Sequence, residues 1–168
     1  MKFLAGFVFC IVLGVAGAVG YSYSGLVDIT AANPDNPAVG WLLHNTYRYS
    51  VRQGMASVAV PANLATPEKI KAGAKLYSEE CVYCHGSPGE DASSLAKGLN
   101  PPAPMLLAGS GPYPANRAFW VAKNGVRMSA MPAWSKSYDD DHLWSVAAFL
   151  SQKRGLSAEE YKALTAGD

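Results

Sequence analysis

The N-terminal segment is one long apolar run. Lys2 carries the first charge, and no other charged residue occurs before Asp28. A run of about 20 apolar residues is long enough to cross a hydrocarbon core of about 30 Å as a helix. A secretory signal peptide has the same basic start but a shorter apolar stretch, with a small-residue cleavage site that residues 16–18 (AGA) could supply. Because the apolar character continues through Val27, we expect an uncleaved membrane anchor over residues 1–27, with a signal peptide as the alternative.

Residues 28–65 follow as a juxtamembrane segment and linker. Turn-forming residues cluster at 33–37 (NPDNP). Residues 41–53 (WLLHNTYRYSVRQ) combine aromatic and basic side chains, which predicts a short amphipathic helix. Trp and Tyr favour the membrane–water boundary and Arg suits lipid headgroups, so this helix either lies on a membrane or packs on the next domain or on a partner subunit. Residues 58–65 are typical of an extended linker.

From Thr66 the pattern predicts a compact helical domain over residues 66–155, followed by a C-terminal tail over 156–168. Thr66 can cap a helix that has Pro67 at its first position, and this helix is expected to run toward Cys81. The pattern contains no strand of useful length and no internal repeat. The expected fold class is therefore all-α.

Two more helices are expected in this domain. Residues 116–123 predict a helix that Asn124-Gly125 stops. The last helix is expected to start near Ser137, because Asp140 follows three residues later as in a capping box. Its apolar residues recur at helical spacing and mark a buried face: Leu143, Val146, Ala147 and Leu150. Residues 86–115 are rich in Gly, Pro and Ser, which indicates an irregular loop.

Charge and cysteine content restrict the partners and cofactors to be expected. The net charge of +1 gives no reason to expect nucleic acid as a partner. The chain has three cysteines, and Cys10 lies inside the apolar run, where we expect an inert small hydrophobic residue. A lipidated cysteine is the alternative there, disfavoured because Phe9 is bulky and few apolar residues precede it. The other two cysteines are the informative ones.

Those two cysteines form the motif C-x-x-C-H at residues 81–85, the attachment signature of c-type haem. Cys81 and Cys84 can each form a thioether to one haem vinyl group, and His85 can then supply an imidazole nitrogen to the iron. A redox C-x-x-C would call for a βαβ context, and a zinc site would need two further ligands. The sequence therefore predicts one haem c, bound covalently through Cys81 and Cys84.

The sixth position of the iron has several candidate ligands. Met/His ligation is typical of cytochromes that transfer electrons. Met131 is followed by Pro132, whose fixed φ and missing donor help to hold a loop still beside the iron. We expect Met131 to be the ligand. The alternatives are Met55, Met105, Met128, His44 and His142.

These motifs together resemble the class I cytochrome c domain, close to the small bacterial monohaem type, over residues 66–153. Gly73 and Tyr77 look like that family's first helix, where the glycine lets the C-terminal helix cross closely and the aromatic ring stacks at the crossing. Residues 143–150 (LWSVAAFL) are similar to the closing helix, and residues 124–134 to the axial-methionine loop.

The resemblance also implies a proline whose carbonyl accepts the N–H of His85, in a P-x-L pattern. Pro104 fits this pattern with Met105 and Leu106, while Pro101 and Pro102 offer other registers. Trp134 is expected to be a wall of the haem pocket or a core residue. The implied architecture is a cytochrome c-like domain around one haem, preceded by a single transmembrane helix.

The expected function is one-electron transfer by a protein that is not itself an enzyme, because protein ligands at both axial positions leave no open site for substrate. The expected partners are a redox donor and acceptor, met either by a tethered carrier or within a respiratory or dehydrogenase complex. Lys2 weakly favours a cytoplasmic N-terminus, which places the haem domain on the periplasmic side of a bacterial inner membrane. The alternatives are an open-haem peroxidase or gas-binding sensor, and a purely structural subunit.

Overall fold

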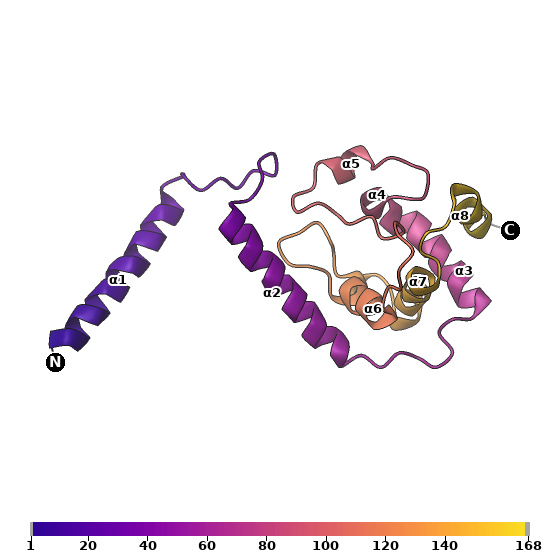
Figure 1. Cartoon of the computed structure of the whole chain (residues 1–168), viewed down its shortest axis with the longest axis horizontal. Helices are drawn as coiled ribbons and strands as arrows, with labels where there is room; N and C mark the ends of the chain where they lie inside the picture. The colour runs from indigo at the N-terminus through magenta and orange to yellow at the C-terminus, as the bar shows by residue number, and fades with distance from the viewer. Residues whose placement is uncertain (1, 167–168) are drawn as a thin grey trace. The chain divides into compact units, whose positions relative to one another are not determined.

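The structure, a computed structural model, describes residues 2–166 and divides the chain into two compact units, residues 1–33 and 34–168. The first unit holds α1 (Lys2–Tyr23), none of whose described side chains is buried (Figure 1). By length and composition α1 could cross a membrane, as the apolar run predicted. Among residues 2–166 every regular element is helical, which confirms the all-α fold class.

The second unit contains seven α-helices within its described residues (Figure 1). They are α2 (Pro37–Ala56), α3 (Pro67–Leu76), α4 (Val82–His85), α5 (Ser94–Lys97), α6 (Ala115–Asn124), α7 (Asp140–Gln152) and α8 (Ala158–Thr165). A π-helical turn, Tyr77–Cys81, joins α3 to α4, and a 3₁₀ turn, Trp134–Lys136, precedes α7.

The crossing of α3 and α7 forms the centre of the core. Tyr77 and Phe149 are the largest fully buried side chains, and their ring centroids lie 5.5 Å apart. Gly73 lies at the crossing point, where a Cβ atom would overlap the backbone carbonyl of Ser145. The two backbones can therefore approach only because residue 73 has no side chain.

The N-terminal cap of α3 is the one predicted from the sequence, and the N-terminal cap of α7 is a different residue. The Thr66 hydroxyl accepts a hydrogen bond of 3.3 Å from the backbone N–H of Lys69, as predicted for the start of α3. The last helix was expected to start near Ser137, but Asp139 caps α7 by accepting from the N–H of His142 at 3.0 Å. Ser137 instead closes the preceding 3₁₀ turn through its N–H to Trp134.

The amphipathic helix predicted at residues 41–53 is part of α2, which packs on α6 through its C-terminal half. Val51 is buried, and a Cβ atom at Gly54 would overlap the ring of Trp120. The side-chain amide of Asn116 donates a hydrogen bond of 3.0 Å to the carbonyl of Met55. Of the alternatives open for this helix, the structure places its C-terminal half on the helical domain.

The expected C-terminal tail contains a helix, α8, that the periodicity did not reveal. The Ser157 hydroxyl accepts from the N–H of Glu160, and the Glu160 carboxylate accepts from the N–H of Ser157, which together form a capping box. Tyr161 is buried, and its ring centroid lies 6.5 Å from that of Tyr77. The helical domain therefore includes α8 as a part of its core.

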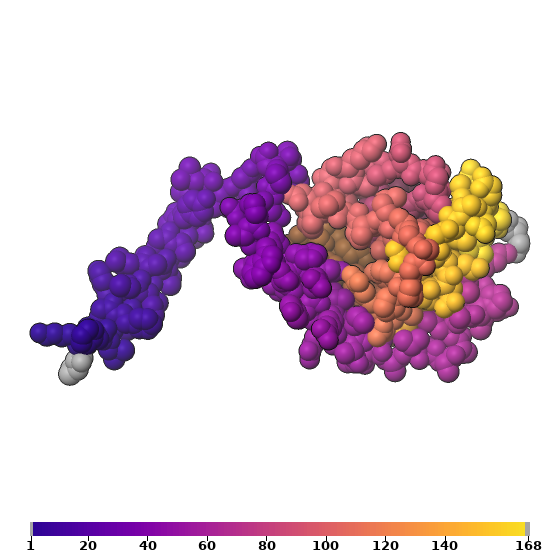
Figure 2. Space-filling model, viewed as in Figure 1, coloured from indigo at the N-terminus to yellow at the C-terminus, as the bar shows by residue number. Residues whose placement is uncertain are grey.

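The linker and the long loop are also more ordered than expected. In the segment 58–65, Leu64 is buried and Val58 packs on the core. The loop 86–115 contains the single turn α5, whose N-cap is Ser93. Figure 2 shows a hollow in the surface between α2 and the loop segment that follows α4.

Candidate haem-binding site

The attachment motif starts in the π-helical turn and ends with α4. A single π turn inside a helix is a recurrent feature of functional sites. Cys81 and Cys84 are both half-buried free thiols. Burial, with smaller contributions from Glu80 and Cys84, raises the pKa of the Cys81 thiol to about 12. Since a redox C-x-x-C motif depends on a lowered thiol pKa, this environment does not suit that alternative.

His85 is oriented by the carbonyl of Pro104. Its Nδ1 atom lies 2.8 Å from the Pro104 oxygen. Because a carbonyl can only accept, Nδ1 carries the proton and Nε2 keeps its lone pair for a metal. Burial lowers the pKa of His85, and the bond to Pro104 opposes that shift only in part. The ring is therefore neutral near pH 7, and Pro104, not Pro101 or Pro102, makes the contact.

Tyr77 holds the end of this motif through its hydroxyl. Its hydroxyl donates a hydrogen bond of 2.9 Å to the carbonyl of Gly86, and the carbonyl of His85 lies 3.3 Å from the same oxygen. Burial raises the pKa of Tyr77, so the hydroxyl remains a donor at all ordinary pH values. The sequence indicated Tyr77 as a packing residue only. The sequence pattern does not indicate that the Tyr77 hydroxyl hydrogen-bonds to a residue nine positions later.

Two hydrogen bonds, one at the carbonyl and one at the N–H of Met131, hold the loop in which this residue lies. The N–H of Val126 donates to the carbonyl of Met131 at 3.0 Å, and the Met131 N–H donates to the hydroxyl of Ser129 at 3.2 Å. Gly125 ends α6 with φ 67°, and a Cβ atom there would overlap the backbone at Pro132. The loop is thus held against the end of α6, with Met131 half-buried.

The other candidate axial ligands lie in different surroundings. Met128 is 88% exposed. Met105 packs on Gly86 and directly follows Pro104, whose carbonyl contacts Nδ1 of His85. The remaining three are Met55, which lies where α2 meets α6, and the exposed side chains of His44 and His142.

Trp134 lies between the methionine loop and the attachment motif. It is half-buried against the core, and its ring centroid lies 5.9 Å from that of Tyr138. The Tyr138 hydroxyl donates a hydrogen bond of 2.6 Å to the carboxylate of Glu80, the residue before Cys81. This contact ties the segment after Met131 to the start of the motif, although 58 positions separate the two residues.

A cluster of two arginines and two tyrosines lies between α2, α6 and the loop that carries Pro104. The guanidinium groups of Arg117 and Arg154 lie 5.3 and 5.6 Å from the centroid of the Tyr113 ring. Arg117 also hydrogen-bonds to Tyr47 of α2, while its buried Nε atom has no partner. Within residues 2–166 neither guanidinium forms an ion pair with a carboxylate. The sequence pattern does not indicate this cluster, because its members come from distant segments.

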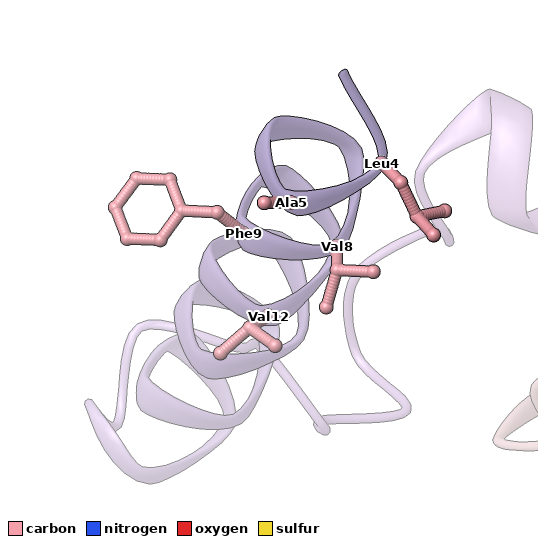
Figure 3. A pocket seen from close by; sticks show the side chains of 5 residues that line it. All are labelled: Leu4, Ala5, Val8, Phe9 and Val12. Atoms are coloured by element: carbon pink, nitrogen blue, oxygen red, sulfur yellow. The ribbon is translucent and has the colours of Figure 1, made fainter. Parts of the chain in front are cut away.

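Two cavities among the described residues differ in place and lining. One, of about 340 Å³, lies behind His85 and is lined by residues of the loops 86–90, 105–109 and 155–156. Cys81, Cys84 and Met131 do not line it, so it is not the space between the candidate ligands. Figure 3 shows the other, an apolar groove along α1 formed by Leu4, Ala5, Val8, Phe9 and Val12. That groove carries no polar side chain and belongs to the surface of the apolar helix.

Comparisons with known proteins find similarity over the segment that carries these residues. Residues 68–150 match the family described as cytochrome c oxidase, cbb3-type, subunit III. A cbb3-type cytochrome c oxidase subunit CcoP from Azospirillum brasilense is 38% identical over 85 residues, which are 49% of this chain and 28% of that protein. The CcoP of Azospirillum sp. (strain B510) is 36% identical over 90 residues, or 52% of this chain and 29% of that protein.

A third relative comes from a different kind of protein. The quinohemoprotein alcohol dehydrogenase of Comamonas testosteroni is 33% identical over 84 residues, which are 50% of this chain and 11% of that protein. The chain spans less than a third of the length of the curated relatives it matches. No solved structure matches the chain.

The helical fold, the C-x-x-C-H motif and the matched segment define residues 68–150 as a c-type cytochrome domain, and such a domain implies haem c as its cofactor. Within that class, residues 68–150 are similar to the family of cbb3-type subunit III cytochromes. With the apolar helix α1, this supports the expectation of a membrane-anchored cytochrome.

Proposed function

We propose that this protein transfers single electrons through one haem c, attached by Cys81 and Cys84 and ligated by His85 and Met131. The observation that carries the proposal is the contact of 2.8 Å between His85 Nδ1 and the Pro104 carbonyl. It leaves a neutral imidazole whose Nε2 lone pair is available to iron. When bound, the haem iron supplies the change between the ferric and ferrous states.

The residues of this chain have separate tasks in the proposal. Cys81 and Cys84 hold the haem in place, and Tyr77 and Pro104 fix the position and tautomer of His85. Met131 comes from a loop that its own hydrogen bonds hold still. Trp134 follows that loop and packs on the core, where it would form a wall of the haem pocket. Together His85 and Met131 would leave the iron no open position for a substrate, so the haem would supply electron transfer alone.

Arg117 suits the carboxylate-bearing edge of the haem. Arg117 is half-buried, and its buried Nε atom has no hydrogen-bond partner within residues 2–166, which costs free energy. The haem propionates are carboxylates of matching charge, which would satisfy this guanidinium together with Tyr47. Two observations on the described residues support this placement: the buried Nε atom has no partner there, and Arg117 forms no ion pair with a carboxylate there.

We further propose that residues 1–27 are an uncleaved anchor in a bacterial inner membrane and that the haem domain, over residues 66–155 and α8, faces the periplasm. The chain then works beside redox proteins of the membrane, either as a tethered carrier or as a cytochrome subunit of a larger complex, and not as an enzyme by itself. Support comes from the apolar helix and from relatives named as subunits of a cbb3-type oxidase.

The test is a pyridine haemochrome spectrum of the full chain purified in mild detergent. We expect one haem per chain with two thioethers, one thioether after Cys81→Ala, and no haem after the double change at Cys81 and Cys84. Cys10→Ala is the matched control and should leave the spectrum unchanged, because Cys10 lies in α1. An unchanged spectrum in the double variant, or readily formed carbon monoxide adducts in the unaltered protein, would contradict the proposal.

A further inference from the structure

The helix α2 has two sides of different character. One side faces the helical domain through three residues at helical spacing. Tyr47 hydrogen-bonds to Arg117, Val51 is buried, and Gly54 packs against the ring of Trp120. The other side of the helix carries Trp41 and Leu42, which are 69% and 56% exposed.

Three more residues extend this outward side. Arg48 and Arg52 follow Trp41 at helical spacing, and Tyr49 lies one heptad after Leu42 with 68% of its surface exposed. We call this set, Trp41, Leu42, Arg48, Tyr49 and Arg52, the outer face of α2. It joins aromatic, aliphatic and cationic side chains on one surface.

The charge of α2 is of one sign. Its 20 residues contain two arginines and no acidic residue. An aromatic and aliphatic surface flanked by arginines matches the boundary of an anionic bilayer, where Trp and Tyr lie at headgroup level and each basic residue is attracted by the lipid charge. A protein partner of the same shape would have to bring acidic residues to Arg48 and Arg52.

The chain between the two units keeps α2 within reach of a membrane. Thirteen residues separate Tyr23, the last residue of α1, from Pro37, the first residue of α2. Even fully extended, such a segment spans at most about 45 Å, and as a flexible coil about 20 Å. If α1 crosses the bilayer, the start of α2 stays near its surface whatever arrangement the two units take.

We propose that the outer face of α2 lies on the headgroup layer of an anionic bilayer. The C-terminal half of the same helix is bound to α6, so the helix holds one side of the haem domain toward the membrane and leaves the others free for redox partners. This inference rests on the proposed membrane anchor, and it goes beyond that anchor by assigning a lipid-binding surface to residues 41–52.

The experiment measures how fast a water-soluble maleimide reacts with a cysteine placed at residue 42. The full chain with its haem carries Cys10→Ser and Leu42→Cys, and it is reconstituted into nanodiscs of phosphatidylcholine with or without phosphatidylglycerol. The matched control is Lys162→Cys in the same background, because Lys162 is exposed on α8. The scaffold protein of the discs is the same in both samples and no redox partner is present, so a difference between the two discs reports on the lipid.

We expect Leu42→Cys to react more slowly in discs that contain phosphatidylglycerol than in pure phosphatidylcholine, by roughly tenfold or more. Adding Arg48→Gln and Arg52→Gln should remove most of that difference, and the control should react alike in both discs. Equal rates for residues 42 and 162 in both discs would overturn the lipid-binding surface while leaving the anchor intact. A chain that does not enter the discs at all would overturn the anchor itself, and its visible spectrum would still report on haem ligation separately.

Discussion

The hydroxyl of Tyr77 donates a hydrogen bond of 2.9 Å to the carbonyl of Gly86, the residue that directly follows His85. Tyr77 is fully buried at the crossing of α3 and α7. The centre of the core is thereby joined to the residue proposed to bind iron. Packing and ligation share one side chain, so a change in the core is transmitted to the ligand.

Tyr77→Phe should lower the free energy of unfolding by about 1–3 kcal/mol, because it leaves a buried carbonyl without its donor. The measurement is chemical denaturation of the haem-bound protein. Tyr161→Phe is the control, since the buried Tyr161 hydroxyl has no partner among the described residues, and removing an unsatisfied hydroxyl should leave stability unchanged or raise it. If both variants lost the same stability, ring packing and not the hydrogen bond would explain the role of Tyr77.

Met131→Ala should open the sixth position of the iron. The oxidised variant should lose the near-infrared charge-transfer band of methionine–iron ligation, and its reduction potential should fall, because a thioether favours the ferrous state. Met128→Ala should keep the band and change stability by about 0.5 kcal/mol or less, because that side chain is 88% exposed. A band retained in both variants would assign the ligand to another residue.

Gly73→Ala should disturb the crossing of α3 and α7, because the new Cβ atom would overlap the backbone carbonyl of Ser145. Backbone cannot move aside as a flexible side chain can, so we expect a loss of about 1–3 kcal/mol or more in unfolding experiments. Gly111→Ala is the matched control, because nothing lies within 4 Å of its Cβ position. Equal stability of the two variants would show that the crossing has room to adjust.

Arg117→Met should lower the reduction potential of the haem, because a positive charge beside the propionates favours the ferrous state. The expected fall is roughly a few tens of millivolts, where 59 mV corresponds to a tenfold change for one electron. Potentiometric titration is the measurement, and Arg127→Met, a change at an exposed residue, is the control. A fall of the same size in the control would indicate a general effect of net charge, not a contact with the haem.

Features that depend on neighbours in the chain were predictable from the sequence. The cap of Thr66 and the helix stop at Gly125 occur as expected, because both are decided within four residues. The capping box of Ser157 and Glu160 was equally readable and would have revealed α8. At the start of α7, Ser137 and Asp139 can both accept a capping hydrogen bond. Asp139 caps the helix because Ser137 belongs to the 3₁₀ turn before it.

Features that depend on distant contacts were not predictable. Nothing local to Tyr138 indicates that it donates to Glu80, and nothing local to Arg117 indicates that it meets Tyr47 of another helix. The resemblance to a known family indicated Pro104 as the partner of His85 but left two other prolines open. Three-dimensional placement of the loop decides among them.

Arg154, which lies just beyond α7, hydrogen-bonds to the loop that follows Pro104. Its guanidinium donates to the carbonyls of Leu106 at 3.0 Å and Gly111 at 2.9 Å, and also to that of Ala108. The loop that begins with Pro104 is thus bound to the end of the main core helix. In electron transfer by a bound haem, any rearrangement around the iron would slow the transfer. Because three carbonyls of the loop that supports His85 are held by one guanidinium, that loop would have little to rearrange, and Arg154 would favour a small reorganisation energy.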